Sequence, residues 1–228
     1  MEVFDTSRYV AVYADIPEIL DGIAGKENIF FHSNELQYAY TIKNNIVRHC
    51  FYAGRYCTKH IFSLQQSCPV SFTSIEVISR NSLGKGVSPF LSVNSRTIDC
   101  NISISHSDTA VFVMLSKENS IRAGCDIVPS GSITEKVVKH LFNMEEQSLC
   151  KQDFSNADKI WSVKEAAYKA GNTGQAFSPK HWNVKHNRND CWKCSPLIAE
   201  ADTAFLVQTF LHKNHIVAVT VKAVKNFS

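Results

Sequence analysis

The sequence predicts a protein of mixed helix and strand, either α+β or α/β, built as two related halves. Short runs rich in β-branched and aromatic residues alternate with stretches of helical periodicity along the chain. This mixture argues against a helical bundle and against an all-β sandwich. A faint internal similarity and a polar segment near mid-chain are the evidence for two halves.

The predicted strands are short and are spread over the whole chain. They comprise "RYVAVYADI" at 8–16, "VSFTSIEVI" at 70–78, "TAVFVML" at 109–115, "AFLVQTFL" at 204–211 and "HIVAVTVKAV" at 215–224. The polar stretch "SKENSIRAG", from Ser116 to Gly124, is the predicted seam. We therefore expect an N-terminal lobe over residues 1–116 and a C-terminal lobe over residues 117–228.

The stretch "WSVKEAAYK", from Trp161 to Lys169, is the clearest predicted helix. At 100° per residue one side is apolar, and the other carries aromatic rings, lysines and a glutamate. Gly171 then provides a stop. A glutamate and a lysine four residues apart are common on exposed helices, but the large rings favour a partly covered face, where the glutamate needs a cation. The apolar side comprises Ile160, Val163, Ala166 and Ala167, and the polar side Trp161, Lys164, Glu165, Tyr168 and Lys169.

The internal similarity links two pairs of segments. Phe31 to Glu35 reads "FHSNE", and Phe142 to Glu146 reads "FNMEE". Each is followed by a predicted helix, "FYAGRYCTK" in the first half and "WSVKEAAYK" in the second. Aligning these helices places Arg55 opposite Glu165 and Lys59 opposite Lys169. The alignment predicts a pseudo-dimer with one cationic and one anionic face toward a shared cleft.

The bulk properties exclude several classes of protein. With 228 residues, 44% of them hydrophobic and 20% charged, the chain has an ordinary soluble globular composition. A net charge of +3 gives no support for nucleic-acid binding. The N-terminus lacks the pattern of a secretory signal, and no apolar run approaches about eighteen residues. We therefore expect a cytoplasmic monomer with reduced cysteines and no membrane contact.

Two stretches carry side chains suited to metal or phosphate chemistry. "AGCDIVPS" places Asp126 at the end of a strand, where it could join Glu165 around one Mg²⁺ ion. "ISISHSD" ends with Ser105 and His106, whose hydroxyl and imidazole suit phosphate oxygens. Seen alone, Asp126 is better explained as a turn or cap residue, and His106 as a packed core histidine. A Ser–His hydrolase is another possibility, but the sequence has no glycine-flanked nucleophile motif of the kind that such an enzyme requires.

Two further stretches concentrate positive charge. "RHCFYAGRYCTK" places Arg48, Arg55 and Lys59 at spacings that align them on one face of a helix. The loop "RNSLGKGVSP" adds Arg80 and Lys85. A solvated helix face and an ordinary surface loop are the alternative interpretations.

The "CWKC" stretch leaves a metal-binding alternative open. Cys191 and Cys194, with His181 and His186 upstream, have residue types that bind zinc. The histidines precede the cysteines, however, and the stretch is more typical of a strand or hairpin than of a zinc finger. A zinc-stabilised interaction domain is therefore one alternative function.

In their order and spacing, "SISHS", "GCDI" and "WSVKEAAYK" resemble the signature of the 4′-phosphopantetheinyl transferases, in particular the Sfp-like class and its enterobactin-synthetase branch. "FYAGR" and "LFNMEE" resemble further segments of that branch. The resemblance implies an α+β fold, a pseudo-dimer of two similar α/β lobes, with coenzyme A between them and Mg²⁺ on its diphosphate. The implied enzyme moves the phosphopantetheine arm onto a serine of an apo acyl or peptidyl carrier protein, releasing 3′,5′-ADP. The implied carriers serve polyketide, nonribosomal peptide or siderophore biosynthesis.

The resemblance also implies roles for individual residues. Asp126 and Glu165 correspond to the metal ligands, and Glu165, or a water that it holds, to the base for the carrier serine. Lys164 and Lys169 correspond to phosphate contacts, and Glu146 to a supporting proton-transfer position. The implied coenzyme contacts in the N-terminal lobe are Arg48, Arg55, Arg80, Lys85, Ser105 and His106.

Three positions depart from the family pattern. Val128 stands where an acidic residue is frequent, and Asp108 where glycine is frequent. The loop that resembles "GKP" reads "GKG". A degenerate homologue, which holds coenzyme A or a carrier protein without transfer, is therefore a second alternative.

Overall fold

The structure, a computed structural model, describes residues 1–81, 83–171, 176–197 and 203–223. The chain divides into two compact units between Ile121 and Arg122. This division lies inside the segment 116–124 in which the sequence predicts a seam. We call the described residues up to Ile121 unit 1 and those from Arg122 onward unit 2. Both units combine helices with antiparallel β-sheets, which is an α+β architecture.

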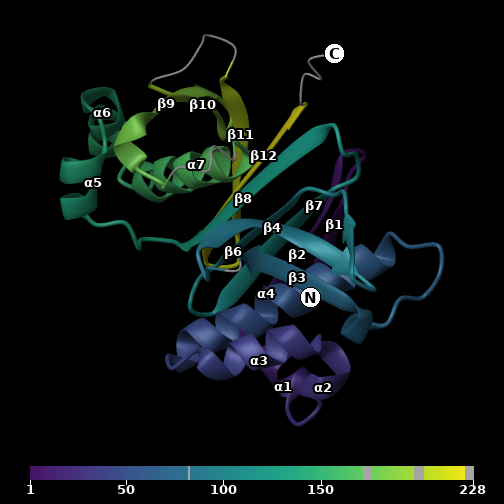
Figure 1. Ribbon diagram of the computed structural model, residues 1–228. Coiled ribbons are helices and arrows are strands. Elements are labelled where there is room, and N and C mark those ends of the chain that lie inside the picture. Colours follow the sequence, from purple (N-terminus) through teal and green to yellow (C-terminus); the bar gives the residue numbers. More distant parts are fainter. Residues whose placement is uncertain (82, 172–175, 198–202, 224–228) are drawn as a thin grey trace. The chain divides into compact units, whose positions relative to one another are not determined.

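Unit 1 contains a four-stranded sheet in the order β1–β2–β7–β6 and a three-stranded sheet in the order β3–β4–β5 (Figure 1). The strands are β1 (Glu2–Asp5), β2 (Tyr9–Asp15), β3 (Ile75–Arg80), β4 (Gly86–Val93), β5 (Arg96–Ile98), β6 (Ile102–His106) and β7 (Ala110–Ser116). The helices are α1 (Ile16–Ile23), α2 (Glu27–Phe30), α3 (Ser33–Thr41), α4 (Asn45–Leu64) and the 3₁₀ turn η1 (Phe72–Ser74).

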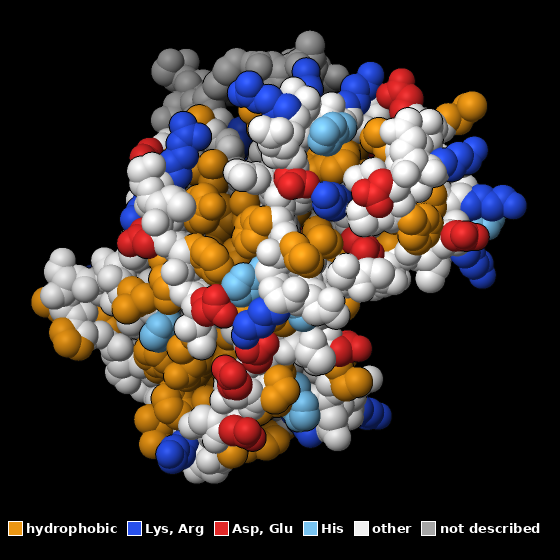
Figure 2. Space-filling model, turned by 180° about the vertical axis from the view of Figure 1, so that it is seen from behind, with side chains coloured by type: hydrophobic (Ala, Val, Ile, Leu, Met, Phe, Trp, Pro, Cys, Tyr) orange, Lys and Arg blue, Asp and Glu red, His pale blue; other side chains and the backbone are white. Residues whose placement is uncertain are grey.

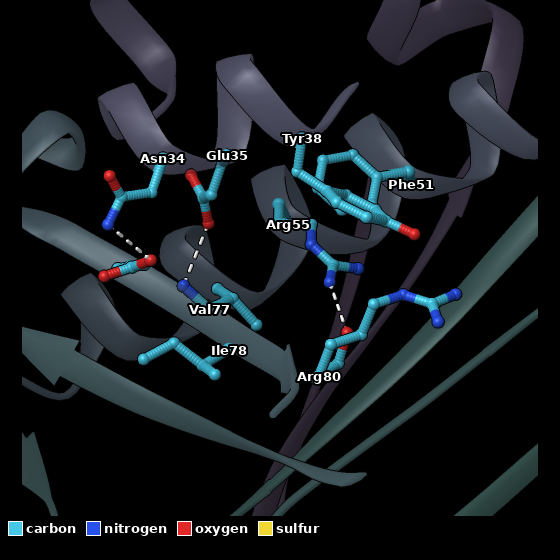
Figure 3. Close-up of a pocket in the computed structure, with 10 residues that line it drawn as sticks. Asn34, Glu35, Tyr38, Phe51, Arg55, Val77, Ile78 and Arg80 are labelled. Atoms are coloured by element: carbon cyan, nitrogen blue, oxygen red, sulfur yellow. Dashed lines mark hydrogen bonds between the residues drawn. The ribbon is translucent and has the colours of Figure 1, made fainter. Parts of the chain in front are cut away.

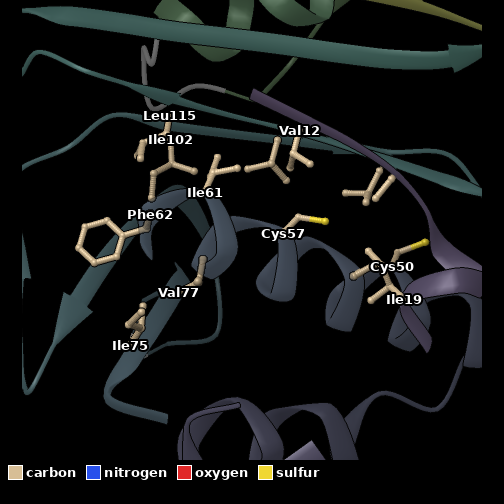
Figure 4. Close-up of a cluster of buried hydrophobic side chains, with 14 of the residues drawn as sticks. Val12, Ile19, Cys50, Cys57, Ile61, Phe62, Ile75, Val77, Ile102 and Leu115 are labelled. Atoms are coloured by element: carbon tan, nitrogen blue, oxygen red, sulfur yellow. The ribbon is translucent and has the colours of Figure 1, made fainter. Parts of the chain in front are cut away.

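Helix α4 forms the centre of the unit 1 core. It begins after Asn44, whose side-chain oxygen accepts a hydrogen bond from the Val47 amide at 3.1 Å. Its apolar side chains lie between the four-stranded sheet and strand β3 (Figure 4). Burial of this face, rather than helix propensity alone, stabilises the helix. The residues labelled there from α4 are Cys50, Cys57, Ile61 and Phe62, and those from the strands are Val12, Ile75, Val77, Ile102 and Leu115.

Unit 2 contains one five-stranded sheet in the order β8–β12–β11–β10–β9. The strands are β8 (Ile121–Pro129), β9 (Trp182–Arg188), β10 (Cys191–Pro196), β11 (Phe205–His212) and β12 (His215–Ala223). The helices are α5 (Glu135–Leu141), α6 (Met144–Gln152), α7 (Asn156–Gly171) and the 3₁₀ turn η2 (Pro179–His181).

Helix α7 packs across the unit 2 sheet and ends at Gly171, as the sequence predicts. Ile160, Val163 and the alanines at 166 and 167 are fully buried, which confirms the predicted apolar side. Gly124 on β8 allows the closest approach, because a Cβ built there would lie 2.1 Å from the Ala166 carbonyl oxygen. Strand β8 and helix α7 are therefore in direct backbone contact.

The surface of the described chain is mixed in character. Hydrophobic, basic and acidic side chains are interspersed on the face shown in Figure 2. All eight cysteines are free thiols. Among the described residues, no helix is long and apolar enough to span a membrane.

Candidate functional site

A cluster of two carboxylates and a lysine lies on the contact between β8 and α7. The Lys169 Nζ lies 2.8 Å from Asp126 Oδ1 and 3.7 Å from Glu165 Oε2. Glu165 and Lys169 are one helical turn apart, and Asp126 comes from the neighbouring strand. Asp126 is almost fully buried, whereas the side chains of Glu165 and Lys169 remain about a quarter exposed. Two acidic side chains from distant parts of the chain therefore meet at one ammonium group.

The electrostatics of this cluster follow from burial and mutual charge. Burial raises the pKa of the Glu165 carboxyl, the charge of Asp126 raises it further, and Lys169 opposes both. Burial acts to lower the pKa of Lys169, but the charges of Asp126 and Glu165 outweigh it and raise that pKa above its ordinary value. The lysine is therefore held in its charged form.

The oxygen donors of this cluster fit a hard divalent cation. Magnesium typically takes one or two protein carboxylates and completes its shell with water and substrate phosphates. Among the described residues, no group of three or more histidine, cysteine or acidic side chains could hold a metal. Val128, two residues after Asp126, offers no ligand atom. A metal here would have the two carboxylates of Asp126 and Glu165 as its protein ligands.

Glu146 and Lys164 do not join this cluster. Both side chains are buried, and Lys164 Nζ donates to Glu146 Oε2 at 2.7 Å and to the Pro179 carbonyl oxygen at 3.0 Å. Glu146 also accepts hydrogen bonds from the backbone amides of Asn143 and Val184. The resemblance implies a phosphate contact for Lys164 and a proton-transfer role for Glu146. Neither role fits side chains that are out of reach of a bound substrate. The geometry instead gives the pair a structural role, which joins α6, α7 and β9.

A matching pair in unit 1 was not anticipated from the sequence. Lys59 Nζ contacts Glu35 Oε2 at 2.5 Å and donates to the Phe72 carbonyl oxygen at 2.9 Å, while Glu35 accepts from the Val77 amide. In its contacts Lys59 resembles Lys164, whereas the sequence alignment pairs it with Lys169. The similarity of "FHSNE" to "FNMEE" was the available signal, since both end in the glutamate of a helix capping box.

Asp158 is a second residue that the sequence did not single out. Its buried carboxylate accepts hydrogen bonds from the amides of Gly131 at 2.7 Å and Ile133 at 2.9 Å. It therefore ties the loop after β8, the strand that carries Asp126, to the first turn of α7, the helix that carries Glu165. An acidic residue in the first turn of a helix was the only sequence signal.

Unit 1 contains two adjoining cavities, of about 160 and about 230 Å³, that share an arginine-lined wall. Arg55 stacks over the Phe51 ring at 3.8 Å and donates to Ser79 Oγ at 2.5 Å (Figure 3). Arg80 lies 5.3 Å from the Tyr38 ring. The residues common to both cavities are Tyr38, Phe51, Arg55, Ser79 and Arg80, and the larger also has His106 in its wall.

The Arg55 guanidinium is suited to bind an anion. It is nine-tenths buried, and its Nε has no hydrogen-bond partner among the described residues. Burial lowers the pKa of Arg55 to about 10, with Glu35 opposing, so the group stays positive at neutral pH. A buried cation with an unused donor beside a cavity favours a bound anion.

Three of the expected coenzyme contacts do not line either cavity. Arg48 donates to the Ile42 carbonyl oxygen and to Asn45, near the start of α4. Lys85 is exposed in the loop before β4. Ser105 is buried on the face of β6 opposite to His106, because successive side chains of a strand alternate.

The structure does not support a zinc site at "CWKC". Cys194 is fully buried in the core of unit 2, and His186 packs on the Trp192 ring with centroids 4.8 Å apart. Among the described residues, which include His181, His186, Cys191 and Cys194, no group of three or more such side chains could hold a metal ion. These contacts favour a packing role for Cys194 and His186.

Comparison with known proteins connects unit 2 to a family. Residues 122–220 match the family described as the 4′-phosphopantetheinyl transferase superfamily. A holo-(acyl-carrier-protein) synthase from Bacillus anthracis, solved in complex with coenzyme A (3′,5′-ADP), is 23% identical over 48% of this chain and 93% of that chain, with a TM-score of 0.40. None of the curated proteins matches the chain.

Proposed function

We propose that this chain transfers 4′-phosphopantetheine from coenzyme A to a carrier-protein serine, because residues 122–220 match the 4′-phosphopantetheinyl transferase superfamily. The observation that carries the proposal is the meeting of Asp126 and Glu165 beside Lys169. Phosphoryl transfer depends mainly on positioning and on neutralising charge, and this cluster offers both metal ligands and a cation.

The proposed roles in unit 2 follow from the donor set. Asp126 and Glu165 would hold Mg²⁺, which would supply charge neutralisation on the coenzyme diphosphate. Lys169 would neutralise a diphosphate oxygen. Glu165, or a water that it holds, would accept the proton of the serine hydroxyl. The serine oxygen would form a bond to the phosphorus that carries the pantetheine, and the bond from that phosphorus to 3′,5′-ADP would break.

The cavities of unit 1 support a role in binding the nucleotide end of the coenzyme. The 3′-phosphate of coenzyme A suits Arg55, Arg80 and His106, since charged and polar donors bind phosphate oxygens strongly. The adenine ring suits an aromatic wall such as that of Tyr38 and Phe51.

We also propose that the two units are related copies of one lobe. In each, a capping-box glutamate binds a buried lysine of the following long helix and a valine amide of the next strand. This correspondence supports the pseudo-dimer implied by the resemblance. The carriers of polyketide, nonribosomal peptide or siderophore pathways are proposed from the resemblance alone.

The proposal is tested by incubating the protein with coenzyme A, Mg²⁺ and a panel of apo acyl and peptidyl carrier proteins. Mass spectrometry should detect one phosphopantetheine arm on the serine of at least one carrier. Glu165→Gln and Asp126→Asn should abolish this gain, while Glu145→Gln, at an exposed acidic residue of unit 2, should keep it.

A carrier panel that stays unmodified with the unaltered protein would reject the enzyme. If the protein still bound coenzyme A in that case, it would be a degenerate homologue. The absence of an acidic residue at Val128 is the reason for that alternative. Near-normal transfer by Glu165→Gln or Asp126→Asn would show that the metal ligands are misassigned.

A further inference from the structure

The Lys169 ammonium lies between the two carboxylates that would hold a divalent ion. Its Nζ contacts oxygens of both Asp126 and Glu165, at 2.8 and 3.7 Å. Magnesium binds carboxylate oxygens at about 2.0–2.1 Å. An ion bound to both carboxylates would therefore lie against the ammonium group, and the two cations would repel each other. The metal and the Lys169 ammonium therefore compete for Asp126 Oδ1 and Glu165 Oε2 at these distances.

The elements beneath the cluster are packed closely together. A Cβ on Gly124 would lie 2.1 Å from the Ala166 carbonyl oxygen and 2.7 Å from the Ala170 amide nitrogen, so β8 and α7 are already in contact. Both alanines are buried in the unit 2 core. Separating β8 from α7 would expose this core, so movement of a side chain is the less costly adjustment.

Lys169 is the member of the cluster that can leave. Its side chain is 24% exposed and has a flexible four-carbon stem. Lys164, on the same helix, is in contrast buried. Its side chain is 1% exposed and donates hydrogen bonds to Glu146 and to the Pro179 carbonyl oxygen. Lys164 has no low-cost alternative position, whereas Lys169 can move toward solvent or toward a bound anion.

We propose that Lys169 is a stand-in for the metal, which holds Asp126 and Glu165 together until the metal and the coenzyme diphosphate bind and draw it away. The identity of the diphosphate rests on the proposed function. A metal that binds without the coenzyme must displace Lys169 from both carboxylates, and the displaced ammonium then gains no anionic partner in return. When the diphosphate is also present, the displaced ammonium gains an anionic partner. Metal and coenzyme should therefore each increase the affinity for the other, because such coupling is reciprocal.

The experiment measures Mn²⁺ binding to the full chain, from the electron paramagnetic resonance signal of free Mn²⁺, with and without coenzyme A. Lys169→Met removes the charge and keeps most of the stem, Lys169→Arg keeps the charge, and Lys159→Met removes a lysine of α7 that pairs with Asp190 instead. Without coenzyme, Lys169→Met should bind Mn²⁺ about tenfold more tightly, which is within the usual range of coupling between sites. The arginine and Lys159 variants should bind it as the unaltered protein does. Coenzyme A should tighten Mn²⁺ binding in the unaltered protein but far less in Lys169→Met.

An unchanged or weaker Mn²⁺ affinity in Lys169→Met, with a folded protein by circular dichroism, would overturn the proposal. Tighter Mn²⁺ binding in Lys169→Met, combined with no effect of coenzyme A on the unaltered protein, would overturn its cooperative part. Failure of the proposed function gives a different result, because the Mn²⁺ measurement without coenzyme does not depend on transfer. In that case the Lys169→Met effect persists while every carrier stays unmodified.

Discussion

Two lysines of α7 that are similar in sequence have opposite environments. Lys164 lies four residues after Ile160 and three before Ala167, and both of these neighbours on the helix surface are fully buried. Its ammonium is therefore committed to the core, where only a carboxylate such as Glu146 can compensate the charge. Lys169 extends from the other side toward Asp126 and remains partly exposed.

Lys164→Met should unfold the protein more easily, by about 3–5 kcal/mol, because it leaves the Glu146 charge buried without a cation. Urea denaturation followed by circular dichroism measures this loss. The matched control is Lys185→Met, which removes an exposed lysine 3.5 Å from Glu145 and should cost less than about 1 kcal/mol. A stable Lys164→Met protein with lost coenzyme affinity would restore the phosphate role for Lys164.

Glu165 should make the stability of the metal-free protein fall with rising pH. Its folded-state pKa is raised by burial, so the folded protein binds a proton that the unfolded chain has already released. This contribution is present at low pH and is lost as the pH rises through the raised value. Glu165→Gln should therefore gain stability relative to the unaltered protein between about pH 4 and about pH 7. Denaturant midpoints at both pH values measure the difference, and a relative loss for Glu165→Gln would contradict it.

At the scale of single residues, the sequence could predict the members of the carboxylate cluster but not the environment of each charge. Glu165 and Lys169 follow from helical spacing, and Asp126 from its position on a strand. The predicted polar side of the helix is too broad, however, because it includes the buried Lys164 together with Lys169. The partners that separate them, Glu146 and the Pro179 carbonyl oxygen, are distant in sequence.

At the scale of elements, the contact between β8 and α7 sets the position of the carboxylate cluster. Gly124 has no side chain at the point where the Ala166 carbonyl and the Ala170 amide meet the strand. Asp126 lies two residues further along β8, on the same face of the strand. The distance between the Asp126 and Glu165 carboxylates therefore depends on Gly124, which has no Cβ and so lets β8 approach α7.

Gly124→Ala should separate β8 from α7 and cost about 1–3 kcal/mol or more, because backbone atoms at 2.1 and 2.7 Å cannot yield as side chains do. It should also weaken Mn²⁺ binding. Urea denaturation and the Mn²⁺ titration measure both effects. Gly22→Ala in α1 is the control, since nothing lies within 4 Å of its added methyl group, and it should be neutral or slightly stabilising. Equal effects at the two glycines would contradict the close-contact interpretation.

The predicted runs at 8–16, 109–115, 204–211 and 215–224 coincide closely with β2, β7, β11 and β12, because the periodicity of these strands is local. The run at 70–78 shows where this fails, since β3 begins only at Ile75, after the 3₁₀ turn Phe72–Ser74. The carbonyl of Phe72 accepts a hydrogen bond from Lys59, which is buried on α4. A tertiary contact thus overrides the strand propensity of the first residues.

At the scale of the whole molecule, the chemical groups are divided between two units with separate cores. Asp126 and Glu165, the proposed metal ligands, lie in unit 2, and the arginine-lined cavities lie in unit 1. The sequence assigns these residues to two predicted lobes, and that the lobes are copies of each other stays a prediction. The two buried glutamate–lysine pairs favour a register that aligns Lys59 with Lys164.

His106→Ala and Arg55→Met should raise the KM for coenzyme A about tenfold or more while Mn²⁺ binding without coenzyme stays unchanged, because both side chains line a cavity of unit 1. Transfer kinetics and the Mn²⁺ titration separate the two effects. Arg96→Met, at an exposed arginine of β5, is the matched control and should change neither. Altered Mn²⁺ affinity in His106→Ala would show that the division of roles is incorrect.

The buried pair of Lys59 and Glu35 has a consequence for protein engineering. Lys59 lies one helical turn after Arg55 on α4, and its pairing with Glu35 holds the helix in its orientation about its own axis. Phe51 and Arg55, which line the cavity, are therefore held in place as well. Saturation libraries at Phe51 and Tyr38 should therefore reshape the cavity for synthetic coenzyme analogues without releasing the helix, provided that Lys59 and Glu35 are left untouched.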